Sequence, residues 1–394
     1  MEKQAGKGVL SRLFNEFLES EQTGGLLLLA CTVVSMVLAN SDWADSYIHF
    51  WHINLQFPIA GLDLDHSIEH WINDGLMAIF FLLVGLEIER ELYIGELSSL
   101  RKAILPVIAA MGGMLIPALI HFSLNSGTIY QNGFGIPMAT DIAFALGMLS
   151  LLGKRVPVAL KVFLTALAII DDLGAILVIA FFYNNGISLV YLSAALGIFV
   201  LLLLFNRLRI RRLVFYLVPG IIMWYCMLQS GVHATITGVL LAFAIPFTKN
   251  DDATNPSYRL QHALHKPVAF LILPVFALAN TAVQLLPGWT EQLRSSNSLG
   301  IITGLFLGKL TGIVVFSWAF VKMKITILPS GVSWKHIAGV GCLAGIGFTM
   351  AIFIANLAFN DPAIIQDSKI AIFAGSLISC VVGLVLLASV RKRI

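Results

Sequence analysis

Charged side chains are scarce in this chain: Asp, Glu, Lys and Arg together make up 12% of its 394 residues. A typical soluble domain carries about 25%. Apolar residues account for 58%, and the mean hydropathy is +0.87. This balance excludes an ordinary soluble globular protein and predicts a chain that lies largely in a membrane.

Cysteine pairs are also lacking. Cys31, Cys226, Cys342 and Cys380 are scattered along the chain with no CxxC pair among them. Redox or zinc chemistry usually needs closely spaced thiols, so we expect these residues only to pack against neighbours. No resident cofactor is expected.

Long apolar runs recur along the whole chain, each of a length that crosses a hydrocarbon core of about 30 Å. Only a helix satisfies its own backbone polar groups in lipid without closing into a barrel. The sequence therefore predicts an all-α polytopic membrane protein with about twelve transmembrane helices. Their approximate limits are 24–40, 71–88, 103–122, 135–152, 156–183, 187–205, 213–229, 232–247, 267–286, 299–320, 337–359 and 370–390.

The basic residues give an independent test of this topology, because Lys and Arg in short loops collect on the cytoplasmic side. With the N-terminus inside, Arg294 and Lys369 are the two loop cations that fall outside. We therefore expect both termini in the cytoplasm, and we read the net charge of +3 as topological rather than as a sign of nucleic-acid binding. Apolar residues at helical spacing in 1–23 predict an amphipathic helix on the cytoplasmic membrane surface.

The external loop between spans 1 and 2 has a pattern of its own. Residues alternate in character over Ile53 to Phe57 and again over Leu62 to Leu64, which predicts a β-hairpin within 45–66. An exposed hairpin edge is a natural contact between subunits. A stiff loop cap is the alternative reading of the same pattern.

Four charges stand near the middle of predicted spans: Asp141, Asp171, Asp172 and Lys309. A charge at that depth costs at least about 2.5 kcal/mol on insertion scales, so each needs a partner or a function. One amine can neutralise one carboxylate, which leaves two carboxylates unexplained by structural pairing. The surplus indicates a cation pathway. Lys161 is different, because it lies near a span end where a long amine can reach water.

The backbone around these charges contains helix-weakening residues. Span 4 has Gly135 and Pro137, and span 11 has Gly345 and Gly347 in a loosely similar stretch. Spans 4 and 11 are seven apart in the order of the chain, an odd number, so they cross the membrane in opposite directions. This arrangement predicts an inverted-topology repeat of spans 3–5 and 10–12, with both interrupted helices at the ion site.

Several motifs closely resemble the NhaA family of bacterial sodium/proton antiporters. They are Ala139-Thr140-Asp141-Ile142-Ala143-Phe144-Ala145-Leu146, Ala168-Ile169-Ile170-Asp171-Asp172-Leu173-Gly174-Ala175, Ser230-Gly231-Val232-His233-Ala234-Thr235 and Gly345-Ile346-Gly347-Phe348-Thr349-Met350. NhaA is itself one of the proteins from which the inverted-repeat rule was drawn, so that architecture is not an independent prediction. The resemblance covers nearly the whole chain. It implies a single transmembrane antiporter domain over 1–394, a homodimer joined partly by the hairpin, residence in the bacterial inner membrane, and an ion site at Asp171 and Asp172.

A mechanism can be built on these residues from the needs of a dehydrated sodium ion, which are hard oxygen ligands and negative charge. We expect Asp172 to be the principal ligand and Asp171 to alternate between the ion and Lys309, with the Thr140 hydroxyl or freed carbonyls completing the shell. Na⁺ (and Li⁺) and H⁺ then compete for the same oxygens. About two protons per sodium would make exchange sensitive to membrane potential. In the family, residues matching Asp141 and Lys309 offset the helix-dipole ends.

A second group of titratable residues lies near the predicted cytoplasmic mouth: Glu87, Glu89, Arg90 and Glu91 at the end of span 2, and His262 and His265 before span 9. The resemblance implies pH regulation here, and histidine titrates near neutral pH. An ordinary solvated loop remains the alternative. The chain departs from the family pattern at Gln261, where a Glu is expected, and at Glu89, where a basic residue is expected. His233 is expected to modulate activity rather than bind the ion.

Other functions fit the sequence less well. An intramembrane aspartyl protease would use two Asp residues on separate spans, but no GxGD stretch is present and Lys309 would have no role. A channel would need a repeated filter segment. The main alternative is a sodium-coupled symporter on a related scaffold.

Overall fold

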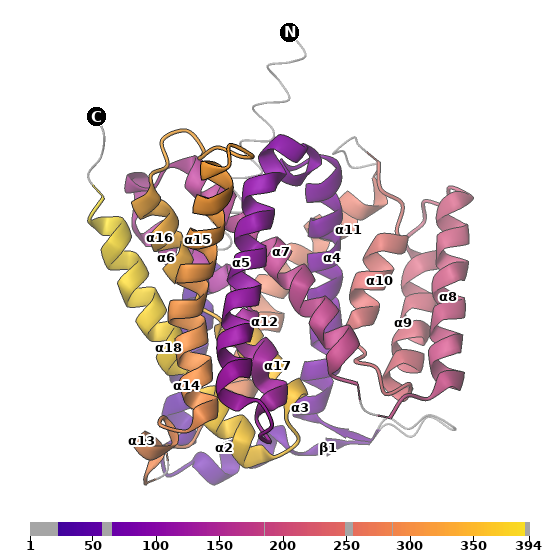
Figure 1. The fold of residues 1–394 in the computed structure, drawn as a ribbon. Helices are drawn as coiled ribbons and strands as arrows, with labels where there is room; N and C mark the ends of the chain where they lie inside the picture. The colour runs from indigo at the N-terminus through magenta and orange to yellow at the C-terminus, as the bar shows by residue number, and fades with distance from the viewer. Residues whose placement is uncertain (1–22, 57–64, 185, 249–254, 286, 391–394) are drawn as a thin grey trace.

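The computed structural model describes residues 23–56, 65–184, 186–248, 255–285 and 287–390, and these are mostly helical (Figure 1). The expected amphipathic helix over 1–23 lies almost entirely outside the described residues.

The helices and strands follow one another along the chain in the following order: the helix Thr23–Ala39, α2 (Ala44–Trp51), β1 (Asn54–Leu55), β2 (His66–Ser67), α3 (Ile68–His70), η1 (Trp71–Leu76), α4 (Met77–Tyr93), η2 (Glu96–Ser98), α5 (Leu100–Asn125), η3 (Gln131–Met138), α6 (Ile142–Leu151), η4 (Gly153–Arg155), α7 (Val158–Phe182), α8 (Leu189–Arg207), α9 (Val214–Gln229), α10 (Ile236–Ala244), α11 (Pro256–Pro267), η5 (Val268–Ile272), α12 (Leu273–Asn280), α13 (Trp289–Gln292), α14 (Ser296–Thr303), η6 (Gly304–Gly308), α15 (Lys309–Lys322), α16 (Trp334–Leu343), α17 (Phe348–Ala358) and α18 (Pro362–Ala388).

Among the described residues, eight helices are long and apolar enough to cross a membrane, and two bent pairs raise this number to ten. Two further apolar segments are shorter, the helix α9 and the helix α10. α10 begins at Ile236, later than the expected start at 232, because a turn at Ser230 to Thr235 precedes it and Gly231 has a positive φ of 80°. The chain is therefore a polytopic helical protein, and the count of twelve spans stays a prediction.

The expected ninth span, 267–286, is wrong at both ends. The helix continues without a break from Pro256 to Asn280. Asn255 caps its start by accepting a hydrogen bond from the Ser257 amide (3.2 Å), and Pro256 occupies the first turn, where its missing N–H costs nothing. The π-helical turn η5 directly after Pro267 accommodates the proline inside the helix. His262 and His265 are therefore helical rather than in a loop.

The expected hairpin within 45–66 is wrong in its first part, because Ala44–Trp51 forms the helix α2, bent by 120° from the helix before it. The Tyr47 hydroxyl anchors α2 to the neighbouring helices, because it lies 2.7 Å from the Leu278 carbonyl oxygen and 3.0 Å from Ser35 Oγ. Beyond α2, β1 pairs antiparallel with β2, with Asn54 opposite Ser67 and Leu55 opposite His66. The connection between the strands, 57–64, lies outside the described residues.

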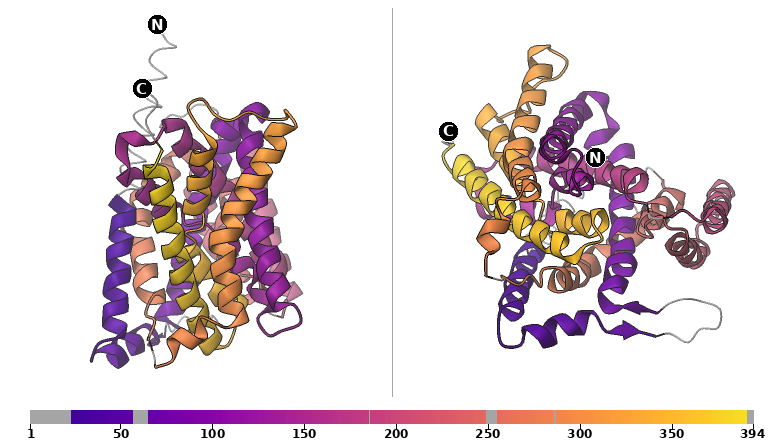
Figure 2. Two further views of the ribbon diagram at one scale, coloured as in Figure 1. Left: turned by 60° about the vertical axis from the view of Figure 1, so that its left-hand side comes forward. Right: turned by 60° about the horizontal axis from the view of Figure 1, so that its bottom comes forward.

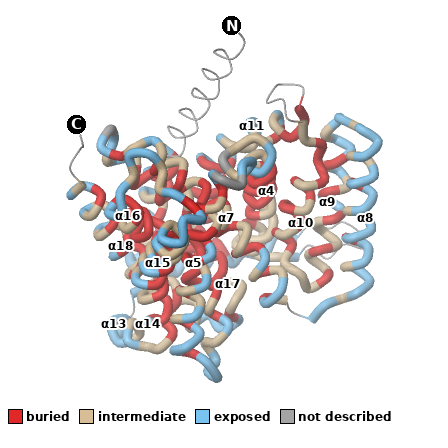
Figure 3. Tube along the Cα trace, turned by 45° about the horizontal axis from the view of Figure 1, so that its top comes forward, coloured by how far each residue is buried: buried red, intermediate tan, exposed pale blue. Residues whose placement is uncertain are grey.

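The helices form a large core and a smaller one. α5 packs along α15 and against η3 of span 4, and α18 packs on α16 and α17, the two halves of span 11. α8 and α9 pack together on the far side of α10 and have a separate apolar cluster (Figures 1 and 3). The end of the bundle that carries α2, α13 and the strands is opposite the end where α4 and α15 finish (Figures 1 and 2).

The contact between α5 and α15 is close enough to exclude any side chain at its crossing. A Cβ added at Gly312 would collide with the carbonyl oxygen of Gly112, and one added at Gly112 would meet Gly312 in the same way. Small residues let membrane helices approach backbone to backbone.

We expect Gly312→Ala to lower the free energy of unfolding in detergent by about 1–3 kcal/mol, because the two backbones must separate. Thermal or denaturant unfolding of the purified protein measures this. Gly197→Ala is the matched control, since a Cβ at Gly197 meets nothing within 4 Å and sits inside α8. Equal stability of the two variants would show that the crossing is not tight.

Candidate ion-binding site

The helix of span 4 stops in mid-span and restarts. η3 ends at Met138, the backbone is extended at Ala139 (ψ 148°) and at Asp141 (ψ 102°), and α6 begins at Ile142. Pro137 lies at the end of η3, where its ring restricts the backbone of the residue before it. The interruption leaves polar backbone groups open inside the bundle.

Span 11 is interrupted in a similar way. α16 ends at Leu343 and α17 begins at Phe348, and the two halves are bent by 48°. The glycines at the break permit a close approach, because a Cβ at Gly345 would collide with the carbonyl oxygen of Leu305. The residues of the break are buried.

The two interruptions cross and satisfy one another's backbone. The Asp141 amide donates to the Ile346 carbonyl oxygen (2.7 Å). η3 packs against α17 and α6 packs against α16, so the two spans run in opposite directions. The predicted interrupted helices thus meet at one point.

Asp141 lies at the start of α6 and of α17, which are the second halves of spans 4 and 11. One carboxylate oxygen accepts from the Phe144 amide at the start of α6 (2.9 Å), and the other accepts from the Thr349 amide at the start of α17 (3.2 Å). The Thr349 hydroxyl donates to the same oxygen. One carboxylate therefore faces two helix N-termini, where negative charge is favoured. Sequence reasoning assigned no role to Thr349, although its place two residues after Gly347 in the second interruption was a usable signal.

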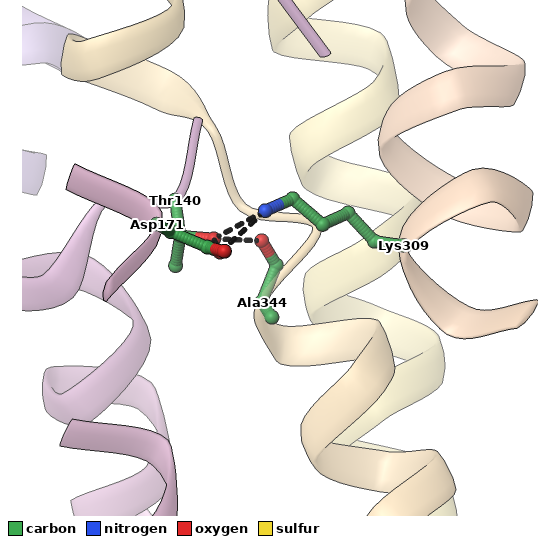
Figure 4. Close-up of polar contacts among 4 residues, drawn as sticks. All are labelled: Thr140, Asp171, Lys309 and Ala344. Atoms are coloured by element: carbon green, nitrogen blue, oxygen red, sulfur yellow. Dashed lines mark hydrogen bonds and ion pairs between the residues drawn. The ribbon is translucent and has the colours of Figure 1, made fainter. Parts of the chain in front are cut away.

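Lys309 reaches the crossing from the side opposite Asp171 and Thr140 (Figure 4). Its ammonium group lies 2.5 Å from Asp171 Oδ2 and 2.9 Å from Thr140 Oγ1, and the Lys309 side chain is fully buried. Thr140 Oγ1 lies 2.7 Å from Asp171 Oδ2 and 2.8 Å from the Ala344 carbonyl oxygen at the end of α16. The Thr140 hydroxyl has one proton, so at any time it can donate either to Asp171 or to the Ala344 carbonyl oxygen, but not to both.

Asp172 is placed differently from its neighbour. Both of its carboxylate oxygens are buried and accept no hydrogen bond from any described residue, whereas one oxygen of Asp171 is held by Lys309 and Thr140. Adjacent residues on a helix diverge by about 100°, which separates their surroundings. Asp172 lines a crevice together with Asp141 and Thr349. A buried carboxylate without a partner is costly, so the site is suited to a cation or a proton.

The crevice connects this site to two of the residues predicted to regulate it, because Glu87 and His265 also line it. Gln261 hydrogen-bonds the Glu87 side chain. Glu89 is buried, and its Oε2 accepts from the Ser257 hydroxyl (3.4 Å), which joins α4 to α11. Gln261 and Glu89 therefore both lie in the contact between α4 and α11.

The remaining predicted regulatory residues are spread out. Arg90 and Glu91 are half-buried at the end of α4, and His262 is exposed, with its ring stacked on Tyr258. His233 is close to Asp74 of η1 and is not among the residues that line the crevice. It therefore lies apart from Glu87 and His265.

Comparison with known proteins decides the family. The model of the family described as Na⁺/H⁺ antiporter 1 matches residues 15–387. The chain belongs to this family. Among its curated relatives, the Na⁺/H⁺ antiporter NhaA of Flavobacterium psychrophilum is 57% identical over 98% of each chain. That of Dechloromonas aromatica is 58% identical over 93% of each chain, and that of Helicobacter pylori is 46% identical over 98% of each chain.

In this member of the Na⁺/H⁺ antiporter 1 family, Asp141 has a structural task that can be tested without transport. We expect Asp141→Asn to lower the free energy of unfolding by about 1–3 kcal/mol, because it removes charge from two helix N-termini and turns one acceptor into a donor. Thermal unfolding measures the loss.

Asp361→Asn is the matched control, because Asp361 caps α18 alone by accepting from the Ala363 amide (2.9 Å) and is exposed. We expect a smaller loss there. A loss at Asp361 as large as that at Asp141 would contradict the double-capping role.

Proposed function

We propose that this chain is a secondary antiporter that exports Na⁺, and also Li⁺, in exchange for H⁺. The observation that carries the proposal is the contrast between two adjacent buried carboxylates. Asp172 faces a crevice and accepts no hydrogen bond within the described part of the chain, while Asp171 is held by Lys309 and Thr140. The names of the relatives, which are Na⁺/H⁺ antiporters, support Na⁺ and H⁺ as the exchanged ions. The protein is accordingly a transporter and not an enzyme.

Competition for the Asp172 oxygens is the basis of the exchange. A dehydrated Na⁺ needs hard oxygen ligands and negative charge, and a carboxylate that holds a proton offers neither in full. Thr140, Asp141 and Thr349 supply further oxygens around the same crossing. The site therefore holds the metal ion or protons, and an empty charged site is too costly to cross the barrier.

The Lys309 ion pair supplies the second proton-linked step. When Na⁺ draws Asp171 toward Asp172, the Lys309 ammonium loses its carboxylate partner and is left buried, so that releasing a proton becomes favourable. About two protons then move per sodium, and transport carries net charge across the membrane.

The crossing of the interrupted helices lets this site change its exposure with small movements. Only a few hydrogen bonds join span 4 to span 11 at the break, among them Asp141 amide to Ile346 and Thr140 to Ala344. Movement of the crossed spans 4 and 11 against the surrounding helices would open Asp172 to one side of the membrane and then to the other.

Regulation and placement complete the proposal. Glu87 and His265 line the crevice that leads to Asp172, so their protonation changes the charge on the path of the entering cation. We propose that the exchange is regulated by pH through Glu87, Arg90, Glu91, His262 and His265, with His233 as a modulator. We also propose that the protein lies in the bacterial inner membrane as a homodimer, with both termini cytoplasmic and β1 and β2 external.

Substitution of Asp172 is the direct test. We expect Asp172→Asn to insert and fold normally but to show no Na⁺-dependent proton movement in everted vesicles, because an amide supplies neither the charge nor the proton site. Vesicles without any organic solute separate antiport from sodium-coupled symport. Scanning pH with Na⁺, Li⁺ and K⁺ also tests the ion preference and the regulation.

Lys161→Gln is the control on the same helix, since Lys161 lies toward the start of α7, far along the helix from Asp172. It should exchange like the parent. Full exchange by Asp172→Asn would remove the basis for the site.

Calorimetry tests the competition itself. We expect Na⁺ binding to the purified protein to release protons, so that the measured heat depends on the ionisation enthalpy of the buffer. Asp172→Asn should give no Na⁺-dependent heat. Identical heats for the parent in all buffers would mean that sodium and protons do not share oxygens.

A further inference from the structure

A second cavity lies on the opposite side of the ion site from the crevice. This outer vestibule is bounded by α2, by the start of α18 and by the residues that follow α12. β1 and β2 lie at the same end of the bundle as α2 (Figure 2). Its polar lining includes Asn73, Asn356, Glu69 and Lys369. The crevice and the vestibule do not share a single lining residue.

The same three structural elements nevertheless line both cavities. α17 contributes Met350 to the crevice and Asn356 to the vestibule. The helix made of η5 and α12 contributes Leu273 to the crevice, and the chain just beyond it contributes Gln284 to the vestibule. The helix made of η1 and α4 contributes Phe80 to the crevice and Asn73 to the vestibule. The barrier between the two cavities is therefore the middle part of these three elements.

The outer layer of this barrier consists of three asparagine side chains, one from each element. Asn280 donates to Asn73 Oδ1 (2.8 Å), and Asn356 donates to Asn280 Oδ1 (2.6 Å). Asn280 is fully buried, and its amide also lies 3.1 Å from the Phe276 carbonyl oxygen. The amides thus form a continuous chain of hydrogen bonds across the floor of the vestibule.

The inner layer consists of three phenylalanines from the same elements. The Phe353 ring lies 5.4 Å from that of Phe81 and 6.3 Å from that of Phe276, and all three are buried. Phe353 is three residues before Asn356, and Phe276 is four residues before Asn280, so on two helices the rings lie one turn deeper than the amides. On these two helices the rings therefore lie between the amides and the residues that line the crevice, Leu273 and Met350.

We propose that Asn73, Asn280 and Asn356 are the outer gate of the transporter, with Phe81, Phe276 and Phe353 as its seal. Amide groups suit this task because their hydrogen bonds to one another are replaced by hydrogen bonds to water when the layer opens. A purely apolar barrier would instead expose its surface to water at each opening. The amides are also neutral, so they neither trap the departing cation nor repel it.

This inference rests on the proposed exchange function, but its test does not measure exchange. Met77 is fully buried on the helix segment between Asn73 and Phe81. In a chain with Cys31, Cys226, Cys342 and Cys380 replaced by alanine, Met77→Cys places one thiol behind the amide layer. Its reaction rate with a membrane-impermeant cationic thiosulfonate, added to right-side-out or everted vesicles, reports how often the gate is open.

We expect Asn280→Leu to raise this rate about tenfold, because the hydrogen bonds that hold the closed layer are lost. The rise should occur only from the face that carries β1 and β2. Asn356→Ala, which leaves the Asn73–Asn280 bond intact, should raise the rate by a smaller factor and provides the test if the Asn280 variant does not fold.

Asn297→Leu is the matched control. Asn297 is equally buried and makes side-chain hydrogen bonds to His121 (3.1 Å) and Ser368 (2.9 Å), but it lies outside both cavities. We expect no change in labelling. An equal rise in this control, or no rise in either gate variant, would overturn the gate. Failure of the exchange tests with Asp172→Asn would leave the labelling result standing, so the two proposals fail separately.

Discussion

The structure depends on one constraint, which is that backbone polar groups cannot be left unpaired in the middle of a membrane. Two spans are nevertheless interrupted there. They are tolerated because the interruptions cross, so that the Asp141 amide finds the Ile346 carbonyl oxygen and the Thr140 hydroxyl reaches the Ala344 carbonyl oxygen. The crossing therefore solves a backbone problem before it does anything for transport.

The charges follow from that solution. Helix ends that meet in a medium of low polarity create local fields, positive at the starts of α6 and α17 and negative at the ends of η3 and α16. Asp141 faces the starts of α6 and α17. Lys309 contacts the Thr140 hydroxyl, which in turn lies beside the Ala344 carbonyl oxygen at the end of α16. Lys309 and Asp171 then neutralise each other, and Asp172 has no hydrogen-bond partner among the residues that the structure describes. The carboxylate that we propose as the principal sodium ligand is thus the one that accepts no hydrogen bond from the described residues at the crossing.

The helices around the crossing are themselves irregular where they bear on transport. Three π-helical turns occur in the described chain, in η1, η5 and η6. η6 directly precedes Lys309, η1 contains Asn73, and η5 lines the crevice through Val268 and Ala269. Such turns weaken the regular hydrogen-bond ladder and are frequent at functional sites. Here they lie beside the ion site and along both cavities, in the elements that must shift if exposure is to alternate.

The sequence by itself determined the class of protein, the interruptions and the identity of the central charges, because each depends on a local cost. Buried charge, proline and glycine within apolar runs are visible without any knowledge of packing. It did not predict the helix α2, the unbroken helix from Pro256 to Asn280 or the short α10, since capping and tertiary contacts decide where helices end. Only the tertiary structure decided that Asp141 caps two helices and that three asparagines from distant parts of the chain meet. Those facts depend on the direction in which each side chain points across a packed interface, and that direction is set by neighbours far away in the chain.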